Sequence, residues 1–169
     1  MSILYSPFTL PTGQTGVIGQ IGPSGGLLTE FDCASNILFI EIATIDPPTL
    51  LATVTLNIDD ATNRVRLTGT VLFRVSSGVE GAFAGVIIQI YVNDPTFTSS
   101  PIFYTEDCGV NSRQVNTFTI SFAFADITPP TGPVTYFLTA IRGGADFGIA
   151  GVSDDRVSFT GAEITANNL

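Results

Sequence analysis

Short apolar or alternating runs, separated by clusters of turn-forming residues, fill this 169-residue chain from residue 36 onward. None keeps a helical period for longer than one turn, and the clusters between them hold the Pro, Gly, Asn and Asp that chain reversals need. The runs predicted as strands are residues 36–44, 50–58, 65–75, 85–92, 102–105, 117–124, 134–141 and 157–166, with a weaker candidate at 148–152. Eight or nine short strands at this spacing predict an all-β fold, a sandwich or jelly roll.

The alternation within two of these runs predicts how the strands are covered. In residues 117–124, one face carries large apolar side chains and the other small semi-polar ones, respectively Phe118, Ile120, Phe122 and Phe124 against Thr119, Ser121 and Ala123. This pattern is typical of one core face and one close-packed face. Residues 36–44 carry apolar side chains on both faces, which indicates another layer or another subunit.

Glycine recurs at every third position before the strand-rich part, at Gly13, Gly16, Gly19, Gly22 and Gly25. Three chains wound together as polyproline-II helices require this period, because only glycine fits at their shared axis. The stretch has a single proline and about four triplets, which is too little for a free-standing collagen helix. Residues 13–26 are therefore predicted to form a short collagen-like neck, with a flexible linker as the alternative.

An apolar arm, residues 1–12, precedes the neck and carries Ile3, Leu4, Tyr5, Phe8 and Leu10. Large apolar side chains are costly to leave in water, so we expect the arm to dock as a connector between subunits. A disordered terminus is the alternative. The arm has no positive region and is interrupted by two prolines, so it is predicted to be neither a secretory signal nor a membrane span. Residues 27–169 form the predicted head.

Charged residues are few and unbalanced, with 15 acidic against 6 basic residues and a net charge of −9. All six basic residues are Arg, and the chain has no Lys, His or Trp. The negative charge argues against nucleic acid and anionic membrane as partners. Without His or Lys the common general bases and Schiff-base nucleophiles are missing. We therefore expect that this protein is not an enzyme and that it has no catalytic residues and no cofactor. Only 12% of residues are charged and 44% are hydrophobic, which predicts protein partners.

Three pairs of carboxylates, Asp59/Asp60, Glu106/Asp107 and Asp154/Asp155, fall in predicted turns. None has the ligand spacing of a calcium loop, so no metal site is predicted.

Two cysteines, Cys33 and Cys108, allow one disulfide within a chain, cross-links between chains, or two buried thiols. The acidic surroundings of Cys108 disfavour a reactive thiolate, so a structural role is predicted for both. Cys33 lies at the predicted junction between the neck and the first strand, where a cross-link could tie the arm to the body or chain to chain.

Arm, Gly-x-x neck and strand-rich head together resemble the collagen-like proteins of Bacillus-type spore surfaces, and the subunits of thin endospore appendage filaments. The resemblance covers nearly the whole chain, and residues 57–75 and the last strand, 156–166, are most similar to such heads. It implies a single C1q/TNF-like jelly-roll sandwich of 8–10 strands that forms homotrimers. It also implies a location on the spore surface (exosporium), outside the cell without a Sec signal peptide, and an anchoring spore-surface protein as a further partner.

The resulting hypothesis is a self-assembling structural subunit, in which trimeric heads are linked head to tail by their N-terminal connectors into a filament. The alternative is a terminal trimeric adhesin, a recognition head that binds a surface glycan or protein. A third interpretation, which the fold alone would support, is that the protein is a virion or toxin component with a jelly-roll fold.

Overall fold

The structure, a computed structural model, describes residues 28–36, 42, 47–75, 83–110, 116–143 and 156–165. The predicted arm, neck and weak strand at 148–152 lie outside these residues. Every regular element among the described residues is a strand: β1 (Leu28–Asn36), β2 (Thr49–Ile58), β3 (Arg64–Val75), β4 (Phe83–Val92), β5 (Phe103–Val110), β6 (Asn116–Asp126), β7 (Gly132–Gly143) and β8 (Arg156–Ile164). The all-β prediction, with eight to ten strands, is confirmed.

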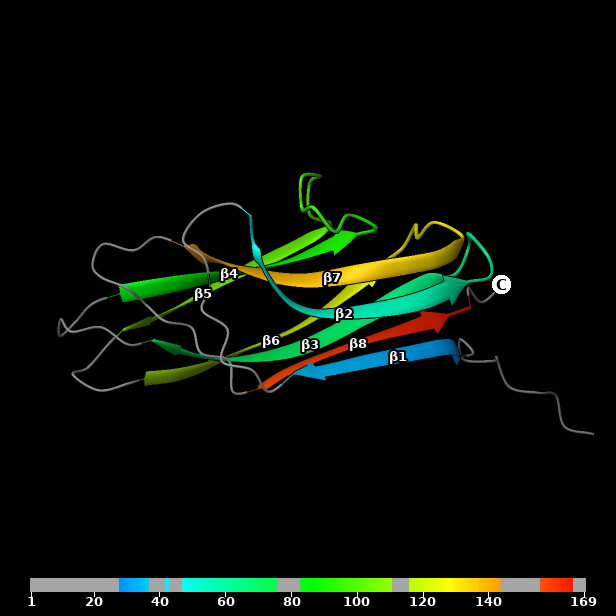
Figure 1. The fold of residues 1–169 in the computed structure, drawn as a ribbon. Helices are drawn as coiled ribbons and strands as arrows, with labels where there is room; N and C mark the ends of the chain where they lie inside the picture. Colours follow the sequence, from blue (N-terminus) through cyan, green and yellow to red (C-terminus); the bar gives the residue numbers. More distant parts are fainter. Residues whose placement is uncertain are drawn as a thin grey trace, which may run out of the picture.

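The strands form two antiparallel sheets packed face to face (Figure 1). Sheet A has the order β1-β8-β3-β6, and sheet B has the order β2-β7-β4-β5. Apart from β4 and β5, which are consecutive, neighbours in each sheet are not consecutive in sequence, as in two interlocked Greek keys, and this arrangement is a jelly-roll sandwich. The edge strands β1 and β2 contact each other on one side of the sandwich, and β5 and β6 contact each other on the other.

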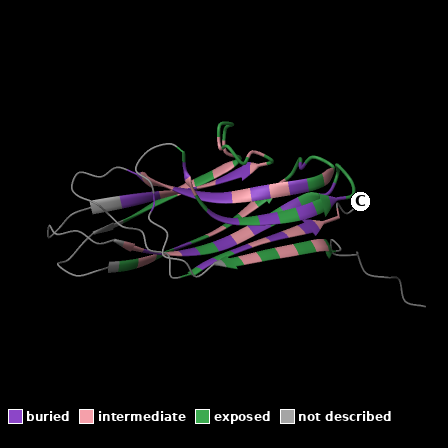
Figure 2. Cartoon of the chain, in the orientation of Figure 1, coloured by how far each residue is buried: buried purple, intermediate pink, exposed green. Residues whose placement is uncertain are grey.

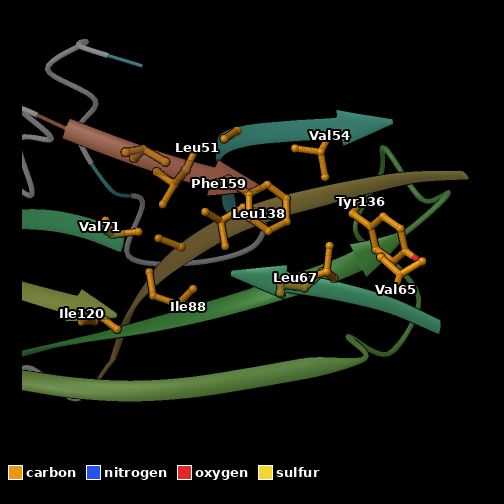
Figure 3. Packing of buried hydrophobic residues seen from close by; sticks show 14 of the residues in the cluster. Leu51, Val54, Val65, Leu67, Val71, Ile88, Ile120, Tyr136, Leu138 and Phe159 are labelled. Carbon is orange, nitrogen blue, oxygen red and sulfur yellow. The ribbon is translucent and has the colours of Figure 1, made fainter. Parts of the chain in front are cut away.

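The core lies between the sheets and follows from the alternation read in the sequence. Buried and exposed residues alternate along β2 from Ala52 to Ile58 (Figure 2). Tyr136, Leu138 and Phe159 from β7 and β8 meet Leu67 of β3 in this core (Figure 3). Burying each such side chain contributes about 1.5–3 kcal/mol relative to exposure. On β6, Ile120 is buried and three phenylalanines pack against the core, which confirms the predicted core face. The other face, predicted to be close-packed, is exposed in this chain at Thr119, Ser121 and Ala123.

The first strand lies earlier in the chain than predicted. β1 spans Leu28–Asn36, whereas the sequence predicted the first strand at residues 36–44, most of which lie outside the described residues. Cys33 consequently lies inside β1 and not at a junction before it. Glu106 and Asp107 are part of β5, so the prediction that they lie in a turn is wrong.

Two carboxylates of β1 explain why an acidic segment forms a strand here. The Asp32 carboxylate accepts a hydrogen bond from the Thr55 N–H at 2.7 Å, and the Glu30 carboxylate accepts one from the Asn57 N–H. Thr55 and Asn57 belong to β2, the edge strand of sheet B, whose outward N–H groups have no neighbouring strand. The side chains of β1 thus satisfy the backbone of the other sheet.

A third carboxylate, Glu163 of β8, is fully buried. It accepts hydrogen bonds from the Thr29 hydroxyl at 2.5 Å, the Asn63 amide at 2.8 Å and the Asp59 N–H at 3.1 Å. Burial alone would raise the pKa of Glu163, but these hydrogen bonds outweigh it and hold that pKa below its usual value. Glu163 therefore fastens the start of β1 and the turn between β2 and β3 to the end of β8.

The buried Tyr136 has a pKa that is shifted in the opposite direction from that of Glu163. Its hydroxyl donates a hydrogen bond to the Asp126 carboxylate at 3.0 Å. Burial, together with the negative charge of Asp126 and this hydrogen bond, raises the pKa of Tyr136 well above its usual value. The phenol therefore stays neutral in the folded protein at any physiological pH.

Candidate assembly surfaces

The outer face of sheet A combines arginines with small side chains. Residues paired across the sheet point the same way, so the register places Phe31, Ala162, Arg66 and Ala125 in one outward row and Cys33, Thr160, Thr68 and Ala123 in the next. Four of the five arginines in the described part of the chain lie on this face: Arg64, Arg66 and Arg74 on β3, and Arg156 on β8. Among the described residues of these four strands, no Asp or Glu points outward. We call this surface the arginine face.

Short hydroxyl side chains make the middle of the arginine face flat. The Thr68 and Thr160 hydroxyls lie 2.6 Å apart, and those of Thr70 and Ser121 lie 3.3 Å apart, so they bond across neighbouring strands. Beside them, a shallow depression of about 390 Å³ is lined by alanines of β6 together with Arg64, Arg66, Phe124 and Ile164. At one border of the face, Leu28 and Phe31 of β1 are more than half exposed, at 55% and 57%. Arg and aromatic side chains are enriched in protein interfaces, so this surface is suited to contact with another protein.

The side of the sandwich formed by β5 and β6 is rich in aromatic residues. Phe103 of β5 reaches across to β6, with its ring centre 5.4 Å from that of Phe122 and 5.3 Å from that of Phe124. All three rings are only partly buried, and Tyr104 next to them is 73% exposed. We call these four residues the aromatic edge. Partly exposed rings at a sheet edge are a common feature of protein interfaces.

The cysteines lie on different sheets. Cys33 is exposed on the arginine face, and Cys108 is exposed on β5 of sheet B; both thiols are free. They are thus neither buried nor joined to each other within this chain. A cross-link between chains stays a prediction. The connector residues and the five neck glycines lie outside the described residues.

The described residues bring together no group of three or more His, Cys, Asp or Glu side chains that could hold a metal ion. Nor does any helix formed by the described part of the chain have the length and apolarity to cross a membrane.

Sequence reasoning missed both Glu163 and the arginine face, although the alternation that reveals them is present. Glu163 follows Val157, Phe159 and Gly161 at every second position, in phase with the core. On β3, the buried Val65 and Leu67 alternate with arginines. The side chains of Arg64, Arg66 and Arg74 therefore point away from the core. Once the strand order is known, the outward positions of neighbouring strands can be aligned, and this alignment places the arginines on one face of sheet A.

No protein-family model and no curated protein sequence matches this chain. Solved structures to which this chain is similar include dimeric latent PorU from Porphyromonas gingivalis, at a TM-score of 0.43 and 9% identity over 91% of this chain. The Gx strain of infectious bursal disease virus is similar at a TM-score of 0.37 and 13% identity over 94% of the chain, and the T13 IBDV particle at 0.34 and 14% over 89%. The chain spans 14% of the PorU chain and 39% and 40% of the two viral chains.

Proposed function

We propose that this protein is a structural, self-assembling subunit without enzymatic activity, which forms homotrimers that stack into a filament on a spore surface. The observation that carries the proposal is the arginine face, a flat positive surface on a chain of net charge −9. Apart from Glu163, which is buried inside the sandwich, the described carboxylates lie on edge strands, in turns and on sheet B. A second copy of the same chain therefore offers the complementary charge.

The trimer contact that fits these surfaces joins the arginine face of one subunit to the aromatic edge of the next. It would cover the partly exposed rings of Phe103, Phe122 and Phe124, which a monomer leaves in water. It would also bring Glu106 and Asp107 of β5 close to the neighbouring arginines. A contact between two different surfaces is heterologous, and three of them can close around a threefold axis.

The neck and the arm extend the trimer into a fibre. The glycine period of residues 13–25 suits three chains that run side by side, and at about 3 Å per residue this stretch spans roughly 40 Å. The arm then reaches the next trimer, with Tyr5 and Phe8 as its aromatic anchors. Repetition of such a contact does not close and gives a filament. Gly19→Val should impair assembly and leave the head folded; normal assembly of this variant would reduce the neck to a linker.

A matched pair of substitutions tests the trimer contact. Thr70 and Thr53 are both exposed strand residues, but Thr70 lies on the arginine face and Thr53 on the outer face of sheet B. In the chain without residues 2–12, we expect sedimentation velocity to show trimers. Thr70→Glu should weaken them at least about tenfold, because its negative charge offsets the arginines of its own face and repels Glu106 and Asp107 of the next subunit, whereas Thr53→Glu should leave them intact. The contact would be refuted if the two variants behaved alike. It would also be refuted if the shortened chain were a monomer even without either substitution.

A further inference from the structure

A groove of about 690 Å³ lies on the outer face of sheet B, on the opposite side of the sandwich from the arginine face. The loop of residues 93–102, which joins β4 to β5, forms one wall and rises above the sheet (Figure 1). Pro47 also lines the groove, and Gln89 and Tyr91 of β4 contribute from the sheet. This volume is within the usual range of small-molecule sites, roughly 300–1,000 Å³.

The loop that forms the groove is held by specific hydrogen bonds. Asn93 and Thr135 exchange two of them, each 2.8 Å long, which tie the start of the loop to β7. The Asp94 carboxylate accepts hydrogen bonds from the Thr96 hydroxyl at 2.6 Å, the Ser99 N–H at 2.7 Å and the Thr96 N–H at 3.0 Å. These donors hold the pKa of Asp94 well below its usual value. The loop is therefore preformed, and the charge of Asp94 is engaged inside it.

Phe97 occupies an unusual backbone conformation in this loop. Its φ is +58°, in the left-handed region that bulky residues rarely adopt. Its ring centre lies 5.3 Å from that of Tyr91 and 6.0 Å from that of Phe137, so the ring is fixed over the sheet. Local strain of this kind persists where the surrounding structure enforces it, and it is concentrated at binding sites. Here it places an aromatic ring in the wall of the groove.

The chemistry of the lining defines a class of ligand. Among the described residues that line the groove, none carries a charge at neutral pH, although the chain holds 15 acidic residues and six arginines. The lining instead combines the Phe97 ring with the hydroxyls of Thr98 and Ser99 and the amide of Gln89. Hydroxyls and amides can both donate and accept hydrogen bonds, as sugar hydroxyls require, and an aromatic ring packs on the C–H face of a sugar. We propose that this groove binds a neutral saccharide of one or two rings.

The site goes beyond the proposed assembly function and does not depend on it, because the groove and the arginine face are on opposite sides of the sandwich. The test uses the full chain and a panel of neutral sugars: glucose, galactose, N-acetylglucosamine and their β-linked disaccharides. Saturation-transfer NMR would detect binding, and titration calorimetry would measure it. The groove is open to solvent, so we expect a Kd of about 0.1–10 mM for at least one sugar.

Three substitutions locate the binding. Phe97→Ala removes the ring and Thr98→Val removes a hydroxyl while keeping the shape of the side chain, and each should weaken binding at least about tenfold, a loss of about 1.4 kcal/mol. Ile127→Ala, an exposed residue between β6 and β7 that does not line the groove, should change nothing. Should Phe97→Ala fail to fold, Thr98→Val still decides the matter.

Three outcomes would overturn the proposal. The first is that no sugar of the panel binds, and the second is that a sugar binds Thr98→Val as tightly as it binds the native chain. The third is that a peptide of residues 1–12 binds in the groove and that Phe97→Ala abolishes this binding. In the last case the groove is an assembly contact between copies of this chain and not a saccharide site.

Discussion

Glu163→Ala should destabilise the head strongly, because the carboxylate is the shared acceptor of three donors in a fully buried position. The Asn63 amide, itself 5% exposed, and the Asp59 N–H would each lose their acceptor at a cost of about 1–3 kcal/mol. Removing the one buried methylene, Cγ, costs about 0.8 kcal/mol more. The exposed Thr29 hydroxyl can turn to water. Together these losses predict about 4 kcal/mol less free energy of unfolding.

Glu163→Gln is the conservative comparison, since it keeps the shape and one acceptor oxygen. Neutral hydrogen bonds are roughly half as strong as charge-assisted ones, so this variant should lose less than half as much as Glu163→Ala. Urea unfolding followed by far-ultraviolet circular dichroism, at one protein concentration in the chain without residues 2–12, measures both. A loss below about 1 kcal/mol in Glu163→Ala would refute the role assigned to this carboxylate.

The pH dependence separates the charge of Glu163 from its packing. Its pKa in the folded protein is lower than the ordinary value of 4.5, so the unfolded chain binds more protons on acidification. The stability that Glu163 contributes is therefore complete above pH 4.5 and is lost as the pH falls through the folded pKa. Glu163→Gln should show a shallower acid slope than the native chain. Identical slopes would contradict the low pKa.

Further predictions concern the packing, the strand edge and a buried tyrosine. In Gly69→Ala the new Cβ would lie 2.4 Å from the Phe122 ring, so the ring must move and the free energy of unfolding should fall by about 1–3 kcal/mol in urea; unchanged stability would show that the ring moves freely. Asp32→Ala removes the acceptor of the Thr55 N–H, so hydrogen exchange at Thr55 should become at least about tenfold faster, and an unchanged rate would contradict the edge contact. Because the pKa of Tyr136 is raised above its ordinary 10.0, stability should fall as the pH rises beyond 10; Tyr136→Phe should remove part of this fall, and an equal alkaline slope would refute it.

Strand positions could be predicted where one face of a strand meets the core. In residues 117–124 the alternation alone separated Phe118 and Ile120 from Thr119 and Ser121, because each inward position demands an apolar side chain. β1 escaped this reasoning, since its inward positions include Glu30 and Asp32, which bind the backbone of β2 instead of entering the core. Edge strands with such roles do not show the apolar period.

Surfaces were less predictable than strands, because they depend on which strands lie side by side. Arg66 and Arg156 are 90 positions apart, and only the pairing of β3 with β8 places them on one face. The groove on sheet B likewise needs Pro47, Phe97 and Ile141 from three separate segments. The turn at Asp60 was predictable, since Thr62 bonds to its carboxylate within two residues, at 2.8 Å.

Negative-stain electron microscopy of the purified protein tests the central claim most directly. The full chain should form long, thin fibres, and the chain without residues 2–12 should give discrete particles of uniform size, because the arm joins one trimer to the next. Discrete particles from the full chain would instead support a terminal recognition head. Fibres from both chains would show that residues 2–12 are not the connector, and would contradict the proposed assembly.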